Sequence, residues 1–428
     1  MTPYYFSASI GDVVNVWAYS HDFATKVGFA HSGSTVQLGV GELNGWQYDS
    51  QYQGAATNCL ITASAVYKVE VSSNLENETG SFQLYISAPQ TSSVVANHIS
   101  TPWRLVYSPN GNKIFSTEWI FDPSFNSNVT VIDPLTSTVV YSYTYSNTVM
   151  LDSVYCGDND TVFVWVSSSA GEFLQEYSSD GSSLTSHSIY SGNPVWQENI
   201  AAKYGLMTYN TSSNQILLVP GFNGGVTPVS WSIYDCTSHT IVHSGSFPSH
   251  AICPIYVPSN DSYYVTAGPG NPLIKINAST YVLSTVSNLT GSVNVANGLA
   301  YIPEVDRFLY GNDVAGECVV IDPSTDSLVA RIPGLFDFCD ATYDPCQDCI
   351  VISDDSAGDI TYADGGGLCY VTTGSYQPVN FVRLYGIYNI VRCDSTSTVF
   401  AHNYNDNEIF SVFTQKPTGS SFPQPPYL

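Results

Sequence analysis

Short apolar runs dominate the chain, and their spacing is that of β-strands. Runs of four to eight residues rich in Val, Ile, Tyr and Phe are bounded by Asn, Asp, Gly, Pro and Ser. Apolar positions that repeat with the period of a helix are almost missing. Such runs, separated by turn-forming residues, predict an all-β protein.

The beginning of the chain has the alternation of a half-buried strand. Val14, Val16 and Ala18 would share one face of a strand, because side chains two residues apart point the same way. The same alternation recurs at 82–86, and the opposite faces are mostly polar. Residues 1–90 are therefore predicted to form a two-sheet β-sandwich.

One hairpin pattern recurs along the rest of the chain. Its clearest copies are 131–140 (VIDPLTSTVV) and 320–329 (VIDPSTDSLV). In each copy an apolar strand ends at an Asp that can accept hydrogen bonds from backbone amides two residues on, and Pro fixes the next φ. Weaker copies are expected at 176–181, 233–237, 276–280 and 362–366.

A second hairpin alternates with the first. It consists of an apolar strand, a polar turn and another apolar strand, as in residues 105–115. Its first strand ends at or near Tyr107, Tyr155, Tyr209, Val257, Ile302, Tyr343 and Arg392. The spacing matches a four-stranded propeller blade of about 40 to 50 residues. The sequence therefore predicts a seven-bladed β-propeller over residues 91–414.

Closing this ring requires one strand from outside the run of blades. The chain has seven inner hairpins but six outer ones, and a Pro-rich tail, 415–428, follows the last strand. Residues 93–99 precede the first inner strand, so we expect them to pair with 409–413 and close the ring. An open ring would leave a strand edge unpaired. The tail cannot form a central strand, but it could lie as an extended arm on a neighbouring subunit.

The chain is acidic and sparsely charged. It has 11 Lys and Arg residues against 36 Asp and Glu residues, and a formal net charge of −25. This charge disfavours nucleic acid and anionic membrane surfaces as partners. Charged residues make up 11 % of the chain, less than half of the usual share of about 25 %. Neutral polar residues must therefore keep the protein in solution, as on many extracellular proteins.

No segment is predicted to enter a membrane. The sequence contains no run of 18 apolar residues, and residues 1–5 (MTPYY) lack the basic and apolar regions of a signal peptide. If the protein is exported, either its signal peptide lies outside this numbering or Met1 is an assigned start. The sequence leaves both alternatives open.

Ten cysteines, an even number, favour disulfides over metal binding. Cys346 and Cys349 have the CxxC spacing of zinc ligands, but the second pair that a zinc ribbon or finger needs is absent. The spacing of the cysteines along the chain does not show which of them form disulfides with each other. The disulfide candidates are Cys236, Cys253, Cys318, Cys339, Cys346, Cys349, Cys369 and Cys393.

Asn-x-Ser/Thr sequons point to a glycosylated exterior. A chain rich in Asn, Ser and Thr contains some sequons by chance, so the number of sequons is evidence for glycosylation but no single sequon is. Which of them carry a glycan cannot be predicted from the sequence. The seven sequons are at Asn77, Asn128, Asn159, Asn210, Asn260, Asn277 and Asn288.

Few residues have the spacing of a catalytic or metal site. His239 and His243 are the closest histidines, but on one strand they lie about 13 Å apart, too far to share a metal ion. The Gly-x-Ser-x-Gly pattern of a serine nucleophile is absent. The densest carboxylates could serve a glycosidase at the propeller mouth, although turn aspartates more often accept backbone hydrogen bonds. These carboxylates are Asp340, Asp344, Asp354 and Asp355.

Calcium is the one cofactor for which the sequence offers a candidate loop. Residues 354–359 (DDSAGD) alternate oxygen ligands along the chain. The loop departs from an EF-hand, because Gly358 is fifth and Gly365, rather than Glu, is twelfth. We expect no other cofactor.

Two parts of the chain resemble known families. Residues 103–145, with YSPNGNKIF at 107–115 and VTVIDP at 129–134, resemble the YVTN-type β-propeller repeats of archaeal and bacterial surface-layer proteins. Residues 5–13, 67–71 and 80–86 are similar to a pre-peptidase C-terminal (PPC) type β-sandwich. Neither pattern includes a fixed catalytic set, so the resemblance implies an exported, surface-associated protein and no active-site residue.

These observations favour an extracellular structural protein over an enzyme. We expect a cell-surface subunit that assembles with copies of itself into a filament or surface layer. The alternatives are a monomeric glycan-binding adhesin and, third, a secreted propeller lyase or glycosidase. The source organism and the symmetry of assembly cannot be read from the sequence.

Overall fold

The computed structural model gives the backbone of the strands between residues 4 and 97, and backbone with side chains over most of 104–412. The residues described with side chains are 104–118, 126–190, 205–219, 230–247, 251–266, 273–286, 298–312, 316–332, 335, 337–355, 367–378, 387–403 and 408–412. Asn77, Asn288 and the tail 415–428 lie outside the described residues.

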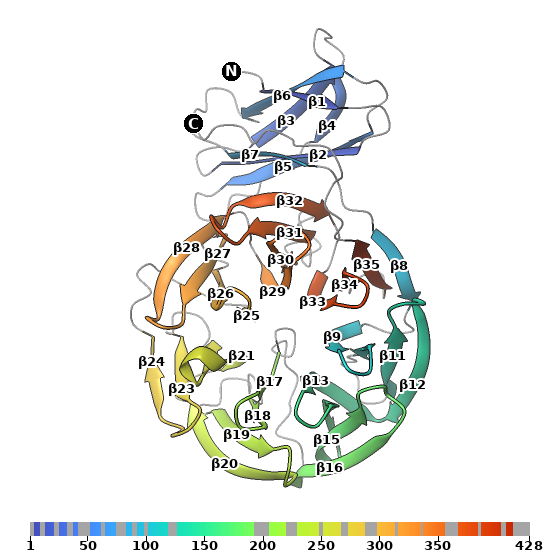
Figure 1. Cartoon of the computed structure of the whole chain (residues 1–428), viewed down its shortest axis with the longest axis vertical. Coiled ribbons are helices and arrows are strands. Elements are labelled where there is room, and N and C mark those ends of the chain that lie inside the picture. The colour runs from blue at the N-terminus through green and yellow to red at the C-terminus, as the bar shows by residue number, and fades with distance from the viewer. Residues whose placement is uncertain are drawn as a thin grey trace.

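Seven four-stranded antiparallel sheets form a β-propeller, with the first strand of each sheet nearest the centre (Figure 1). Blades 1 and 2 are consecutive β-meanders. Blade 1 contains β9 (Pro102–Ser108), β10 (Lys113–Glu118), β11 (Asn126–Asp133) and β12 (Thr138–Ser146). Blade 2 contains β13 (Thr148–Cys156), β14 (Thr161–Ser168), β15 (Gly171–Ser178) and β16 (Leu184–Ser191).

Blades 3 and 4 continue the ring in the same order. Blade 3 contains β17 (Met207–Asn210), β18 (Gln215–Leu218), β19 (Val229–Asp235) and β20 (Thr240–Phe247). Blade 4 contains β21 (Ile252–Val257), β22 (Ser262–Thr266), β23 (Ile274–Asn277) and β24 (Leu283–Thr285), with the 3-10 turn η2 (Pro258–Asn260) after its first strand.

Blades 5 and 6 follow, and blade 7 is built from both ends of the propeller sequence. Blade 5 contains β25 (Leu299–Ile302), β26 (Arg307–Asn312), β27 (Glu317–Asp322) and β28 (Ser327–Pro333). Blade 6 contains β29 (Phe338–Asp344), β30 (Cys349–Asp354), β31 (Gly367–Thr372) and β32 (Pro378–Arg383). Blade 7 contains β33 (Ile387–Cys393), β34 (Thr398–Asn403), β35 (Glu408–Phe413) and β8 (Ser92–Asn97).

Strand β8 closes the ring. It is antiparallel to β35, with Ala96 opposite Ile409 and Val94 opposite Phe410. Ile409 is fully buried, in an apolar cluster that also contains Leu105 of blade 1. The first and last parts of the propeller sequence therefore meet in one sheet and in one core.

The remaining strands precede β8 and form two further sheets. One sheet has the order β1-β6-β3-β4 and the other has the order β5-β2-β7. Their strands are β1 (Tyr4–Ala8), β2 (Val13–Ser20), β3 (Thr25–His31), β4 (Gln37–Gly41), β5 (Tyr52–Leu60), β6 (Ala65–Ser73) and β7 (Gln83–Ser87). Within the described part of the chain, no helix is long and apolar enough to cross a membrane.

The apolar core lies between neighbouring blades. Phe163 and Trp165 of β14, for example, pack in one buried cluster with Leu218 of β18 and Tyr234 of β19. The side chains alternate along β14, so those between them face the preceding blade: Val162, Val164 and Val166 pack with Phe115 and Val131 of blade 1. Each blade thus buries both of its faces, which explains the nearly continuous apolar runs of the middle strands.

A tyrosine on the first strand of each of six blades fixes the turn that follows. Its hydroxyl donates to the Asn or Asp side chain five residues later, as Tyr155 does to Asp160 at 2.9 Å. The acceptor has a positive φ, 55° at Asp160, a conformation that Asn and Asp tolerate better than most residues. The other pairs are Tyr107–Asn112, Tyr209–Asn214, Tyr256–Asp261, Tyr301–Asp306 and Tyr343–Asp348.

The predicted outer hairpin of blade 6 was assigned to the wrong residues. It was predicted at 362–366, which lie outside the described residues, whereas the third and fourth strands of blade 6 are joined through 373–377. Thr372 takes the place of the Asp, since its hydroxyl accepts the backbone N–H of Gln377 at 3.2 Å. A turn that begins with Thr lacks the Asp-Pro pattern, so this hairpin could not be recognised from that pattern.

Candidate functional site

The outer strands of blades 1 to 3 form an exposed, uncharged surface. Their sequences are TVVYSYTYS in β12, LTSHSIYS in β16 and TIVHSGSF in β20, with no Lys, Arg, Asp, Glu or Pro. On β12, Val140 and Tyr141 are 39 % and 41 % exposed. On β20, Val242 is 48 % exposed. We call β12, β16 and β20 the open edges.

Among the described strands, each open edge is the last strand of its sheet and pairs with one neighbour. Its outward N–H and C=O groups therefore form a template on which another strand could add. The outer strands of blades 4 to 6 carry features that discourage such pairing. The strand β24 has three residues, β28 carries Arg331 and Pro333, and β32 carries Pro378 and Arg383.

At the centre of the propeller, polar contacts link the first strands of neighbouring blades. Arg104 on β9 donates from Nε to Oδ1 of Asp152 on β13, at 2.7 Å. The other oxygen of Asp152 accepts the backbone N–H groups of Leu206 and Met207 in blade 3, at 2.6 and 2.7 Å. The fully buried Asp152 carboxylate thus joins three consecutive blades.

A related set of contacts joins blades 6, 7 and 1. Asn389 on β33 donates from Nδ2 to Asp340 on β29 and accepts the backbone N–H of Leu105 at 2.5 Å. Like Asp152, Asp340 lies at a shift in strand register, which turns its side chain toward the next blade. Burial raises the pKa of Asp340 to about 6, although the Arg104 guanidinium acts in the opposite direction.

These central contacts can hold the blades in register, because every group in them has a partner in another blade. Gly205 leaves the space that Arg104 needs. Its φ is +95°, and a Cβ atom there would lie 2.5 Å from Nη2 of Arg104. The Gly205 carbonyl also accepts the N–H of Cys253 at 3.0 Å, which extends the contacts to blade 4.

The four carboxylates that the sequence grouped together are not all neighbours. In the register of β29 and β30, Asp344 lies opposite Cys349 and Asp354 lies opposite Phe338. Asp344 and Asp354 are therefore at opposite ends of this hairpin, about 17 Å apart at about 3.3 Å per residue. Glycosidase carboxylates lie within about 10 Å of each other, so these two do not form such a pair.

Of the candidate calcium loop, Asp354 and Asp355 fall within the described residues. Both are buried, and Asp355 lies near Asp337 and Cys339, with one potential ligand atom from each of these three within 4.8 Å of the others. A thiol beside two carboxylates suits a softer cation better than calcium, which prefers oxygen ligands. Calcium binding by residues 354–359 stays a prediction.

The cysteines are mostly buried on strands. Cys156 and Cys236 lie across blades 2 and 3 with their sulfur atoms 3.9 Å apart. Burial raises the thiol pKa of Cys156 and Cys369 well above its ordinary value, and that of Cys349 to about 12. Such thiols are poor nucleophiles. Cysteine spacing could not reveal the Cys156–Cys236 contact, because the fold of two blades brings the pair together.

The described disulfide candidates lie in several blades. Cys253 is on β21, Cys318 on β27, Cys339 on β29, Cys349 on β30, Cys369 on β31 and Cys393 on β33, while Cys236 and the exposed Cys346 lie in turns. In the described residues, neither Cys346 nor Cys349 belongs to a group of three potential metal ligands. The disulfide prediction stays a prediction.

Several sequon asparagines make hydrogen bonds within the protein. Asn210 is 1 % exposed and donates from Nδ2, the atom that a glycan would occupy, to the Tyr263 hydroxyl at 3.1 Å. A glycan on Asn210 would require that contact to break. The Nδ2 groups of Asn128, Asn159 and Asn260 also donate within the protein. Asn277 instead accepts from Thr280 in a turn, so glycosylation at Asn277 leaves its turn bond in place.

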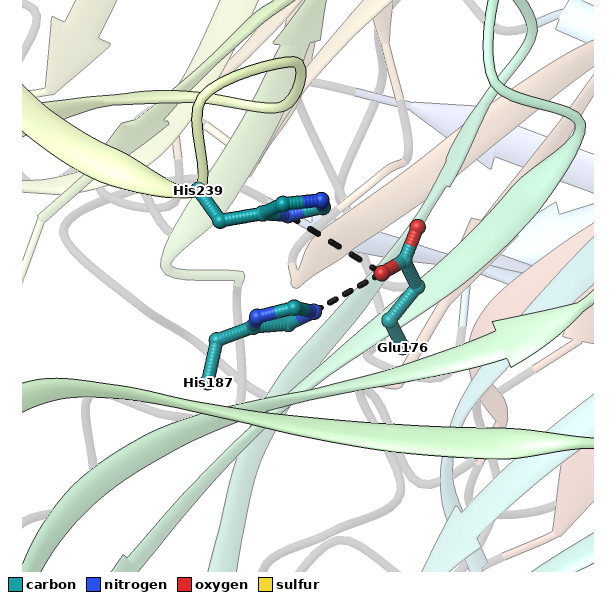
Figure 2. Close-up of side chains that lie close together, drawn as sticks. All are labelled: Glu176, His187 and His239. Carbon is teal, nitrogen blue, oxygen red and sulfur yellow. Dashed lines mark hydrogen bonds and ion pairs between the residues drawn. The ribbon is translucent and has the colours of Figure 1, made fainter.

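A histidine cluster lies near the outer rim between blades 2 and 3 (Figure 2). Nε2 of His187 is 2.8 Å from Oε2 of Glu176, and Nδ1 of His239 is 3.9 Å from the same oxygen. The two imidazole rings stack with centroids 4.0 Å apart and planes 4° apart. His239 was predicted to lie on one strand with His243. It lies instead in the turn before β20, with a φ of 56°.

No protein-family model matches this chain, and none of the curated proteins compared with it matches.

Proposed function

We propose that this chain is an extracellular structural subunit that assembles with copies of itself through the open edges. The observation that carries the proposal is the uncharged, exposed composition of β12, β16 and β20. In most soluble β-proteins the edges are short or carry Lys or Pro, since an unprotected edge pairs with other chains. In an assembling subunit, such an edge is where a neighbour binds.

The β12 edge has the chemistry of an interface. It is nine residues long and exposes Val139, Val140 and Tyr141 to 49 %, 39 % and 41 %. Tyr143 and Tyr145 instead pack against blade 2. Tyrosine is enriched at interfaces, because its ring supplies apolar area and its hydroxyl keeps a hydrogen bond. The net charge of −25 makes whole subunits repel, so contact is favoured where the surface carries no charge.

Sequence resemblance supports the same function. Residues 103–145 resemble surface-layer propeller repeats, and we propose that the two sheets of residues 1–90 pack as a PPC-like β-sandwich. Ten cysteines and the sequons suit an exported protein. The Pro-rich tail 415–428 could serve as an arm on the adjacent subunit.

The test is electron microscopy of the full-length protein, with charge placed on one open edge. Val140→Lys on β12 should raise the concentration needed for assembly at least tenfold, which corresponds to about 1.4 kcal/mol per subunit. The matched control is Val329→Lys on β28, a site of similar exposure (43 %) on a strand that already carries Arg331. It should leave assembly unchanged.

If Val140→Lys and Val329→Lys change assembly equally, the subunits do not assemble through the open edges. Dispersed wild-type particles under all salt conditions would overturn self-assembly itself, and a glycan array would then test the adhesin alternative.

A further inference from the structure

Three potential metal ligands from two blades meet at the outer rim of the propeller. Glu176 is on β15 and His187 on β16, both in blade 2, while His239 lies in the turn between β19 and β20 of blade 3. One ligand atom from each residue lies within 4.8 Å of the other two. In Figure 2 the carboxylate of Glu176 faces a ring nitrogen of each histidine.

The fold holds these side chains in place before any ion binds. The backbone N–H of His239 donates to the Asp235 carbonyl at 2.9 Å, which fixes the turn. Its ring nitrogen Nδ1, the potential ligand atom, lies 3.3 Å from the hydroxyl of the buried Tyr234, a contact that an ion bound at Nδ1 would replace. The ring of His187 lies 6.4 Å from the buried Phe163, between centroids. The backbone of the ligands is thus fixed, so ion binding orders side chains alone and loses little conformational entropy.

The neighbouring blade junction shows what the stacking alone contributes. His243 on β20 stacks on Tyr281, in the corresponding turn of blade 4, at 4.2 Å and 14°. His239 and Tyr281 have nearly the same φ, 56° and 59°. An aromatic stack between an outer strand and the next turn is therefore a packing feature of this propeller. The junction of blades 2 and 3 adds a second imidazole and a carboxylate, which packing does not require.

The charges of the cluster favour a cation. A neutral imidazole offers the lone pair of a ring nitrogen to a cation, and two such rings lie 4.0 Å apart here. The Glu176 carboxylate supplies the opposite charge. Side-chain exposures of 14 % for His187, 15 % for Glu176 and 37 % for His239 leave a route from solvent and room for water ligands.

Two imidazoles and one carboxylate suit Zn²⁺ and similar borderline cations rather than the hard Ca²⁺ or Mg²⁺. Zinc bonds of about 2.0–2.1 Å place neighbouring ligand atoms of a tetrahedron roughly 3.3 Å apart. The observed separations from the carboxylate oxygen, 2.8 and 3.9 Å, lie on either side of that value. The two ring planes are parallel, so their in-plane lone pairs do not converge in the stack, and an ion that binds both rings must rotate them apart.

We propose that Glu176, His187 and His239 form a binding site for one Zn²⁺ ion that joins blades 2 and 3. The ion lies between the Glu176 carboxylate and the two imidazole rings, and water completes its coordination. Because the ligands come from both blades, zinc binding stabilises their contact.

The test is zinc titration of the full-length protein by calorimetry, after its exposed thiols have been alkylated to remove Cys346 as a competing ligand. All proteins carry Cys339→Ala, which removes the thiol from the second group of potential ligands, Asp337, Cys339 and Asp355. One Zn²⁺ per chain should bind and raise the thermal midpoint. Glu176→Gln, His187→Ala and His239→Asn should each weaken binding at least tenfold. Asn is chosen at 239 because it tolerates the positive φ. His243→Ala removes the equivalent stack and should leave zinc affinity unchanged.

Cobalt provides a second readout. Co²⁺ at this site should give the visible absorption of nitrogen and oxygen ligation without a thiolate charge-transfer band. The absence of zinc binding to the wild-type protein, or binding that survives Glu176→Gln, would overturn the proposal. Glu176→Gln has the same shape as the wild type and keeps a hydrogen-bonding group for His187, so lost binding in that variant cannot be ascribed to unfolding if its circular dichroism is unchanged.

Discussion

At the scale of single residues, Glu172 is a carboxyl buried in the second blade. This side chain is 2 % exposed and accepts a hydrogen bond from Nε1 of Trp165 at 3.1 Å. Burial raises its pKa from 4.5 to about 7, and the hydrogen bond from Trp165 opposes the shift only in part. At neutral pH the protein therefore holds a carboxyl whose charged form is poorly solvated.

The pKa of Glu172 sets a pH window for stability. The folded state holds this proton more tightly than the unfolded chain, so the contribution of Glu172 to stability is greatest below pH 4.5 and falls as the pH rises toward about 7. The loss is on the order of 3 kcal/mol at about 1.4 kcal/mol per pKa unit. Glu172→Gln, which cannot ionise, should remove this dependence and stabilise the protein at pH 8. Urea denaturation at pH 4.5 and pH 8 measures the difference, and parallel pH profiles for the two proteins would contradict the assignment.

The rim cluster shows which residue contacts sequence cannot reveal. His239 precedes Thr240, Ile241 and Val242, whose strand propensity made it look like part of the same strand. The residue instead adopts a positive φ in the turn and meets His187, 52 positions earlier in the chain. Only the packing of one blade on the next brings these two rings together. The hydrogen bonds of Asn210 and other sequon asparagines were hidden for the same reason.

At the scale of elements, the blades share turn chemistry that was partly visible in the sequence. The Asp-Pro hairpins were recognisable because Asp133 and Asp322 accept the amide two residues on. The bond from a tyrosine to the Asn or Asp five residues later went unnoticed, since both residue types are common in this chain. In blade 6, Thr372 takes the place of the Asp, so the position of that hairpin was predicted wrongly. Turn position was thus predictable where a turn uses its commonest residues.

The tyrosine bond of blade 5 should stabilise its turn measurably. Tyr301→Phe removes the hydroxyl that donates to Asp306 at 2.9 Å and should lower the free energy of unfolding by about 1 kcal/mol. Asp306→Asn should lower the free energy of unfolding by less, because Asn occupies the same place in blades 1 and 3 and tolerates the φ of 48°. Tyr141→Phe, at a hydroxyl-bearing side chain 41 % exposed, is the control. Urea midpoints compare the variants, and a loss no larger than that of the control would show that the bond contributes nothing.

At the scale of the whole molecule, seven blades could be counted from the sequence because each repeats one pair of hairpins. The contacts that hold the ring together could not be predicted in this way. Arg104, Asp152, Asp340 and Asn389 lie three residues before Tyr107, Tyr155, Tyr343 and Arg392, so they share one position of the repeat, where the residue type differs among blades. The period gives this position, but the packing of the first strands decides which residue of another blade each side chain meets.

Ring closure gives a prediction for the whole propeller. Strand β8 covers the edge of β35, where Ile409 and Val412 are fully buried. Deleting residues 1–97 removes β8, whereas deleting residues 1–90 removes the two preceding sheets and keeps it. The longer deletion should lower the thermal midpoint by roughly 5–10 °C relative to the shorter one, since 1 kcal/mol is worth about 2–4 °C in domains of 150–250 residues.

The two deletions differ by only seven residues, so the comparison isolates β8. Without it, the β35 edge is open to other chains, and the longer deletion should also associate in analytical ultracentrifugation. A synthetic peptide of residues 90–101 should pair with β35, restore the midpoint and suppress that association. Equal midpoints for the two deletions, or a peptide without effect, would mean that contacts between blades hold the ring closed without the β8–β35 pairing.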